Sequence, residues 1–149
     1  MNAGRNTGKM PGSFCIFKVP INPLIMEKVS YFWELEVYKL CSQLAREIFE
    51  LSKAFPKQEM YSLTDQIRRA SRSVGGQIAE AWGKRKYEKH FVSKLTDADG
   101  EQLETQHWLR TARDCSYLSA DVADNLLNQY LSVGNMLDSM MKKSSWFKI

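Results

Sequence analysis

The chain has 149 residues, 44% hydrophobic and 26% charged, a composition typical of one globular domain with its own core. No apolar run approaches the ~20 residues of a membrane-spanning helix, and three widely spaced cysteines (Cys15, Cys41 and Cys115) favour reduced thiols over disulfides. The formal net charge is +4. These features exclude a membrane-spanning or disulfide-stapled protein and predict a cytoplasmic one.

Residues 1–30 are interrupted by glycines and prolines and have no usable periodicity, which predicts a flexible or extended tail. From Trp33 to Leu51, apolar residues recur every three or four positions, and this spacing predicts a first helix. Pro56 disfavours helical geometry at Phe55, so the chain is expected to turn there. The predicted folded domain covers residues 31–145.

The clearest pattern lies between Leu63 and Trp82, where a regular apolar stripe predicts an amphipathic second helix. Ser62 is expected to cap its first free N–H groups, with Asp65 at the positive helix end. Gly75 and Gly76 are unfavourable inside a helix and suggest a kink or a close backbone approach. The stripe comprises Leu63, Ile67, Ala70, Val74, Ile78 and Ala81.

A third helix is predicted from about Glu88 to Asp114, with a stripe that polar residues interrupt in the middle. Gly83 and the basic residues after it are expected to end the second helix, with glycine taking a left-handed conformation. Ser119 is expected to cap a fourth helix whose stripe runs from Val122 to Met140, and residues 144–149 are expected to fray. Four helices joined by short turns predict an all-α, antiparallel up-down-up-down four-helix bundle.

Positive charge is concentrated between Ile67 and Lys94, where eight basic and two acidic residues give a local charge of +6. Clustered cations suggest a phosphate-bearing partner, and Tyr87, His90 and Phe91 could stack on unpaired bases. A solvated helix end that pairs with nearby acids remains an alternative. The candidate nucleic-acid-binding residues are Arg68, Arg72, Lys84, Arg85, Lys86 and Lys89.

A second stripe on the same helix consists wholly of hydrogen-bonding side chains. We call it the polar seam: Gln66, Arg69, Ser73, Gln77 and Glu80. Burying such groups is costly unless each finds a partner, and buried polar networks tend to select one arrangement of helices or subunits. The seam is therefore interpreted as an assembly feature, with ligand binding as the alternative.

Glu104 and His107 have the E-x-x-H spacing of di-iron bundle proteins, but no second such pair is present, so no metal site is predicted. Asp97, Glu101 and Glu104 are instead expected to form an acidic face that complements Arg68, Arg69 and Arg72, either within one chain or between subunits. Cys41 and Cys115 are expected to be small core residues. No nucleophile–base pair or phosphate loop can be recognised, so neither catalysis nor a cofactor is expected.

Several strings of this chain occur together in a known family. They are Phe55-Pro56-Lys57-Gln58-Glu59, Gln66-Ile67-Arg68-Arg69-Ala70, Ile78-Ala79-Glu80 and Leu103-Glu104-Thr105-Gln106. In this combination the chain resembles the four-helix-bundle proteins encoded in intervening sequences of bacterial 23S ribosomal RNA genes. The resemblance implies a ring-like homopentamer that binds nucleic acid, with RNA or DNA as partner and no catalytic residues. A homo-oligomeric scaffold for other proteins, without a nucleic-acid ligand, is the alternative.

Overall fold

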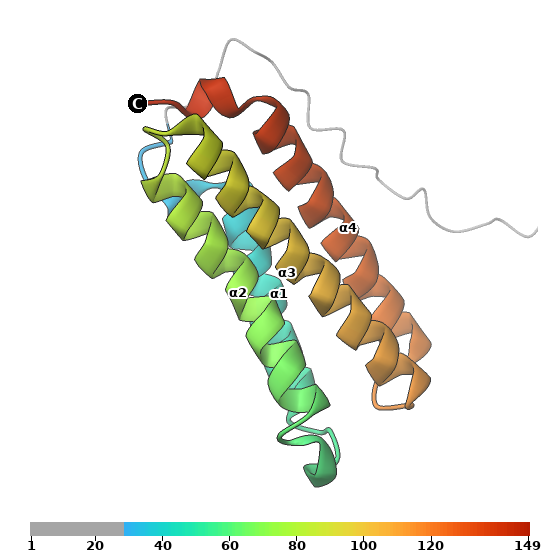
Figure 1. Cartoon of the computed structure of the whole chain (residues 1–149). Coiled ribbons are helices and arrows are strands. Elements are labelled where there is room, and N and C mark those ends of the chain that lie inside the picture. The colour runs from blue at the N-terminus through green and yellow to red at the C-terminus, as the bar shows by residue number, and fades with distance from the viewer. Residues whose placement is uncertain (1–28) are drawn as a thin grey trace, which may run out of the picture.

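The structure, a computed structural model, describes residues 29–149, which form an all-helical bundle with no strand in that range. Successive helices run in alternating directions (Figure 1), as the sequence predicted. The helices are α1 (Glu36–Ser52), α2 (Leu63–Gly83), α3 (Glu88–Asp114) and α4 (Ala120–Lys142), with short 3-10 helices η1 (Phe32–Glu34), η2 (Lys57–Glu59) and η3 (Ser144–Phe147). The predicted tail, residues 1–30, lies outside the described residues except for positions 29 and 30, as does Cys15. None of the described helices is long and apolar enough to cross a bilayer.

Helix α2 carries the apolar stripe that the sequence predicted, and all six residues of the stripe are buried. The predicted Ser62 cap is wrong, because the Ser62 side chain accepts no hydrogen bond from the helix start. The Ser62 hydroxyl instead donates to Glu59, and the same carboxylate accepts the Leu63 backbone N–H at 3.3 Å. A glutamate from the preceding turn therefore supplies the negative charge at this positive helix end.

Glu59 also accepts a hydrogen bond from the Tyr117 hydroxyl at 3.0 Å, which ties the α1–α2 connection to the α3–α4 turn. Hydrogen bonds from Ser62, Tyr117 and the Leu63 N–H lower the pKa of the Glu59 carboxyl below its ordinary value of 4.5. Because the folded pKa is the lower one, this contribution to stability is present above about pH 4.5 and is lost as the pH falls through the folded pKa.

As the pH is lowered from about 5 to about 3, we expect the free energy of unfolding to fall less in Glu59→Gln than in the unmodified protein. Urea unfolding at several pH values measures this slope. Glu36→Gln, which removes an exposed carboxylate paired with Lys39, is the control and should change the slope much less. An acid slope that is the same in Glu59→Gln as in the unmodified protein would contradict the prediction.

The first helix begins later than its periodicity predicted. Trp33 lies in η1 and is 51% exposed, and the extended backbone of Leu35 separates η1 from α1. Trp33 therefore lies outside the core, where it stacks on Tyr31 with ring centroids 4.5 Å apart. Val37, Leu44 and Ile48 of the predicted stripe are buried, and Cys41 joins them as expected.

Polar residues fill the gap in the α3 stripe; Gln102 and Gln106 are buried, and Asp99 is half-buried. Gln106 Nε2 donates to Gln102 Oε1 at 2.7 Å, and Gln102 Nε2 donates to Asp99 Oδ1 at 2.9 Å. Gly134 of α4 makes room for this chain, since a Cβ there would lie 3.0 Å from Gln102 Nε2. The buried polar chain of this bundle therefore lies between α3 and α4 rather than on α2.

Tyr130 of α4 is fully buried, and among residues 29–149 its hydroxyl is the buried side-chain polar atom without a well-aligned hydrogen bond, although Thr105 lies close enough to interact with it. An unpaired buried hydroxyl costs free energy that a hydrogen atom in its place does not. We expect Tyr130→Phe to raise the free energy of unfolding by about 1 kcal/mol. Chemical denaturation followed by circular dichroism measures the change, and a loss of stability would show that the hydroxyl has a partner in solution.

Helix α4 matches its prediction, since the Ser119 side chain accepts the Val122 N–H at 3.3 Å. The expected fraying is wrong for residues 144–147, because the chain continues into η3 and the Phe147 ring lies 5.5 Å from the Phe91 ring. Gly83 does not take a left-handed conformation; the backbone leaves α2 through Lys84 at φ −98°.

Cys115, expected in the core, is exposed in the α3–α4 turn.

Candidate nucleic-acid interface

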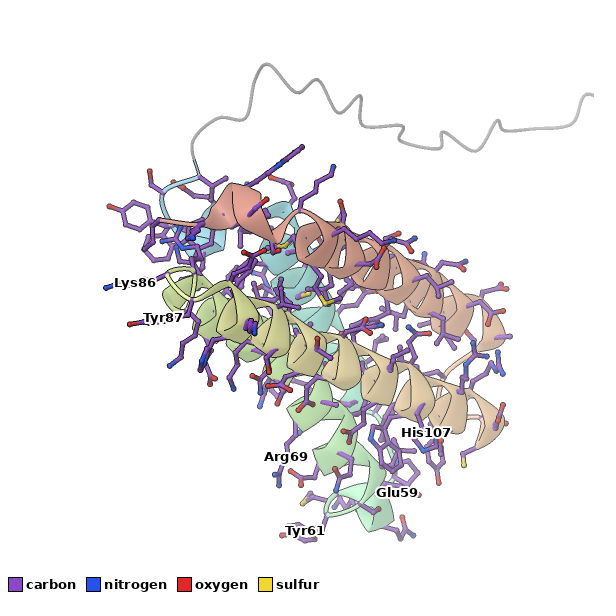
Figure 2. All side chains as sticks on the ribbon, turned by 45° about the horizontal axis from the view of Figure 1, so that its top comes forward. Glu59, Tyr61, Arg69, Lys86, Tyr87 and His107 are labelled. Carbon is purple, nitrogen blue, oxygen red and sulfur yellow. The ribbon has the colours of Figure 1, made fainter. Side chains whose placement is uncertain are left out.

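The turn between α2 and α3 presents the densest group of predicted binding residues. The Lys84 N–H donates to the Ala81 carbonyl and the Tyr87 N–H to the Lys84 carbonyl, each at 2.8 Å, so the turn is tight. Figure 2 shows Lys86 and Tyr87 projecting from it, at the end of the bundle opposite Glu59 and Tyr61. Lys89 and His90 follow in the first turn of α3 and are exposed.

Arg85 differs from its neighbours in the turn because its side chain folds back on α2. Its Nε donates to the Trp82 carbonyl at 2.8 Å, and its Cζ lies 3.4 Å from the centroid of the Trp82 ring. Burial lowers the pKa of this guanidinium. Arg85 therefore satisfies a free carbonyl at the end of α2, a structural role that leaves less of its charge for a ligand.

Among residues 29–149, the three lysines in and just after the turn form no close ion pair, although Lys84 is near enough to Glu80 for its charge to help lower the pKa of that carboxyl. Lys84, Lys86 and Lys89 are exposed, and in the described part of the chain no carboxylate oxygen lies within 4.0 Å of their Nζ atoms. Aromatic rings are interleaved with them: Lys86 Nζ lies 5.8 Å from the Tyr87 ring, and the Tyr87 and His90 rings are 5.9 Å apart. Exposed cations beside exposed rings are the chemistry of single-stranded nucleic-acid sites.

Helix η3 adds residues that are distant in sequence. The Ser144 hydroxyl donates to Glu88 Oε1 at 2.6 Å, and with the Phe91–Phe147 ring contact this fixes η3 on the start of α3. Lys143 lies 5.0 Å from the Trp146 ring, which is 54% exposed. We call the combined surface the basic–aromatic end: Lys84, Lys86, Tyr87, Lys89, His90, Lys143 and Trp146.

The remaining two predicted binding residues, Arg68 and Arg72, lie elsewhere. They precede Lys84 by 16 and 12 residues on α2, which places them about 24 and 18 Å away along the helix axis. Both face Phe49 of α1, with guanidinium carbons 4.8 and 5.2 Å from its ring centroid. The six candidates therefore do not form one surface.

The polar seam lies at the surface of the chain, alongside α3, and is not a buried network within it. Lys94 of α3 donates to Gln77 Oε1 at 3.2 Å and contacts Glu80 at 2.7 Å, while Arg69 lies 3.7 Å from Asp65 on its own helix. Gln66 and Ser73 are half-buried and, among the described residues, have no side-chain hydrogen bond. Three seam residues therefore find partners inside the chain.

Within one chain, the predicted acidic face complements α2 only in part, and pairing between subunits stays a prediction. Lys94 pairs with Asp97 at 3.5 Å, and burial together with the charges of Glu104 and Asp97 raises the pKa of Glu101. The charge of Arg69 opposes that rise, so Arg69 and Glu101 attract each other as expected, whereas Arg68 and Arg72 face α1. No group of three or more His, Cys, Asp or Glu side chains in residues 29–149 could hold a metal ion.

Comparison with protein families identifies the chain. The family model of the 23S rRNA-intervening sequence proteins matches residues 33–139. The chain belongs to this family. Among solved structures, it is similar to a protein of unknown function from the S23 ribosomal protein family of Bacteroides thetaiotaomicron, with 26% sequence identity and a TM-score of 0.65. The match covers 71% of this chain and 98% of the Bacteroides chain, and no curated protein matches.

Sequence reasoning missed the contribution of Lys143 and Trp146 to the basic–aromatic end of this 23S rRNA-intervening sequence protein. The available signal was Phe147, an apolar residue in a segment that is otherwise mostly polar and basic. Its ring packs on Phe91 of α3, and this contact brings the C-terminal cations to the α2–α3 turn.

Proposed function

We propose that this protein is a non-enzymatic oligomer that binds RNA through the basic–aromatic end. The supporting observation is the set of three lysines without carboxylate partners beside the exposed Tyr87 ring. Each lysine that neutralises a phosphate releases condensed counterions, which favours binding at low salt. Exposed rings add base stacking, worth about 1–3 kcal/mol per base, where the strand is unpaired.

RNA is the first ligand to test because the family is named for intervening sequences of 23S rRNA and the Bacteroides protein for a ribosomal protein family. Assembly into a ring, which the family resemblance implies as a homopentamer, would repeat the basic–aromatic end around the symmetry axis. Several weak sites on one particle bind a long strand far more tightly than one site does. Self-association is therefore part of the proposal.

A mobility-shift titration of the full chain against structured RNA and single-stranded DNA, repeated over a series of salt concentrations, tests the proposed function. We expect the logarithm of the association constant to fall linearly with the logarithm of salt concentration. No shift at low salt, or an affinity that does not respond to salt, would contradict RNA binding. Co-purifying protein without nucleic-acid absorbance at about 260 nm would favour the scaffold alternative.

A further inference from the structure

A groove of ≈ 320 Å³ runs between α1 and α2, away from the basic–aromatic end. Its volume is at the lower end of the range of about 300–1,000 Å³ that is usual for small-molecule sites. The residues of its wall that carry the argument are Tyr38, Arg46 and Phe49 of α1 and Arg72, Gly75 and Gly76 of α2. The groove is therefore lined by aromatic rings, by arginine side chains and by the backbone of two glycines.

The two glycines leave the α2 backbone open at this groove. A Cβ on Gly76 would meet no atom within 4 Å, and a Cβ on Gly75 would lie 3.5 Å from the Tyr38 ring, an ordinary contact. Packing inside the chain therefore requires glycine at neither position, although glycine is unfavourable in a helix interior. The predicted close backbone approach is not found within the chain, which leaves this stretch accessible to a bound molecule.

Within the described part of the chain, the cations at the groove form no ion pair with an acid. Arg46 and Arg72 are exposed, and no carboxylate of the described residues lies within 4.0 Å of their guanidinium groups or of Arg68. Arg68 and Arg72 both approach the Phe49 ring, at 4.8 and 5.2 Å, and Lys53 Nζ lies 4.9 Å from the same ring, so like charges gather around one aromatic side chain. An anion placed there would relieve this repulsion and accept forked guanidinium hydrogen bonds.

The deeper wall of the groove is electrically neutral. Cys41 is 1% exposed, and burial raises the pKa of its thiol to about 12, so the sulfur carries no charge near neutral pH. The Ser71 hydroxyl donates to the Arg68 carbonyl at 3.1 Å, and Glu50, an acid of α1, is paired with Lys53 at 2.7 Å. No unpaired acid on these walls opposes a phosphate.

We infer that this groove binds a small phosphate-bearing aromatic molecule of the nucleoside monophosphate class. The phosphate lies against Arg46 and Arg72, and the base packs beside Tyr38 and Phe49 over the open backbone of Gly76. Guanidinium groups supply charge-assisted hydrogen bonds to the phosphate, and the rings supply stacking. This site is separate from the proposed RNA interface, and neither requires the other.

Isothermal titration calorimetry of the full chain with adenosine monophosphate, adenosine and inorganic phosphate tests the site. We expect saturable binding of adenosine monophosphate, with adenosine and phosphate each binding at least about 10-fold more weakly, because each retains one half of the contacts. Absence of saturable binding of adenosine monophosphate, or equal binding of adenosine, would overturn the inference.

Two variants locate the binding. Arg72→Gln should weaken the binding of adenosine monophosphate by about 10-fold or more, since it removes a charged hydrogen bond to the phosphate. Gly76→Leu should weaken it at least as much, because the new side chain enters the groove while leucine favours the helix. Arg69→Gln, on the same helix with a side chain 73% exposed outside the groove, is the matched control and should bind within about 2-fold of the unmodified protein.

Circular dichroism confirms that each variant is folded, and sedimentation velocity reports its oligomeric state. Equal losses in Arg69→Gln and Arg72→Gln would overturn the site, as would unchanged binding by Gly76→Leu. Dissociation of an oligomer by Gly76→Leu would also overturn it, because a second copy of the chain would then occupy the groove. Binding of adenosine monophosphate is expected to persist in a variant that no longer binds RNA, so the two proposals fail separately.

Discussion

Replacement of Lys84, Lys86 and Lys89 by glutamine is expected to weaken RNA binding by about 100-fold at about 0.1 M salt. For a single strand, each lysine–phosphate contact contributes about 0.7 to the slope of the logarithm of the association constant against the logarithm of salt concentration. At about 0.1 M salt, losing one contact therefore lowers the association constant about five-fold. None of the three lysines has a carboxylate partner within 4.0 Å among residues 29–149, so their charge is available to a ligand. The mobility-shift titration should show both a lower affinity and a salt slope reduced by about 2.

The matched control changes the same number of charges at the opposite end of the bundle. Lys53, Lys57 and Arg110 are exposed there, and their combined replacement by glutamine removes the same formal charge. This control should stay within about 3-fold of the unmodified protein, because screening over about 10 Å limits the influence of distant charges. Equal losses in the two triple variants would mean that net charge, and not the basic–aromatic end, determines affinity.

Phe91→Ala is expected to lower the free energy of unfolding by about 3–5 kcal/mol. Phe91 is 1% exposed at the start of α3, so its removal leaves a cavity, and its ring also holds Phe147 at 5.5 Å. Loss of that contact should release η3 and raise hydrogen exchange at residues 144–147. Urea denaturation measures the first effect and exchange with mass spectrometry the second.

Leu103→Ala is the matched control for Phe91→Ala on the same helix. Leu103 is 55% exposed, so truncation should change stability by only about 0.5 kcal/mol. A loss below about 1 kcal/mol for Phe91→Ala would show that this position is not packed as the structure has it. If Phe91→Ala lowers the free energy of unfolding strongly but leaves hydrogen exchange at residues 144–147 unchanged, then η3 is held by other contacts.

The helices could be predicted from sequence because their stripes are local and repetitive. The bounds of α2 and α3 and the Ser119 cap follow from spacing and capping chemistry over a few residues. The start of α1 could not be predicted in this way, since Trp33 fits the stripe but stacks on Tyr31 outside the helix. The cap of α2 was assigned to Ser62, whereas Glu59 reaches it from a separate turn.

In the candidate site, too, some residues could be found from the sequence, whereas others depend on how the helices pack. Lys84, Lys86 and Lys89 lie together because they are neighbours in sequence, so composition alone could find them. Arg85 has the same charge, but only its distance of 3.4 Å from the Trp82 ring shows that it has a structural role. The pairing of the polar seam with Lys94, 17 residues beyond Gln77, likewise depends on how α2 and α3 pack.

The all-α class, the four apolar stripes and the basic α2–α3 turn follow from the sequence alone, because each depends on residues within one helix or one turn. Three features required the packed helices: Lys143 and Trp146 lie beside that turn, Arg68 and Arg72 face Phe49, and the polar chain of Gln106 and Gln102 lies on α3. The physical reason is that the partner of a side chain is set by how helices pack, and contacts such as Ser144–Glu88 join residues 56 positions apart. Local periodicity shows which face of a helix is buried, but not which residues of another helix cover it.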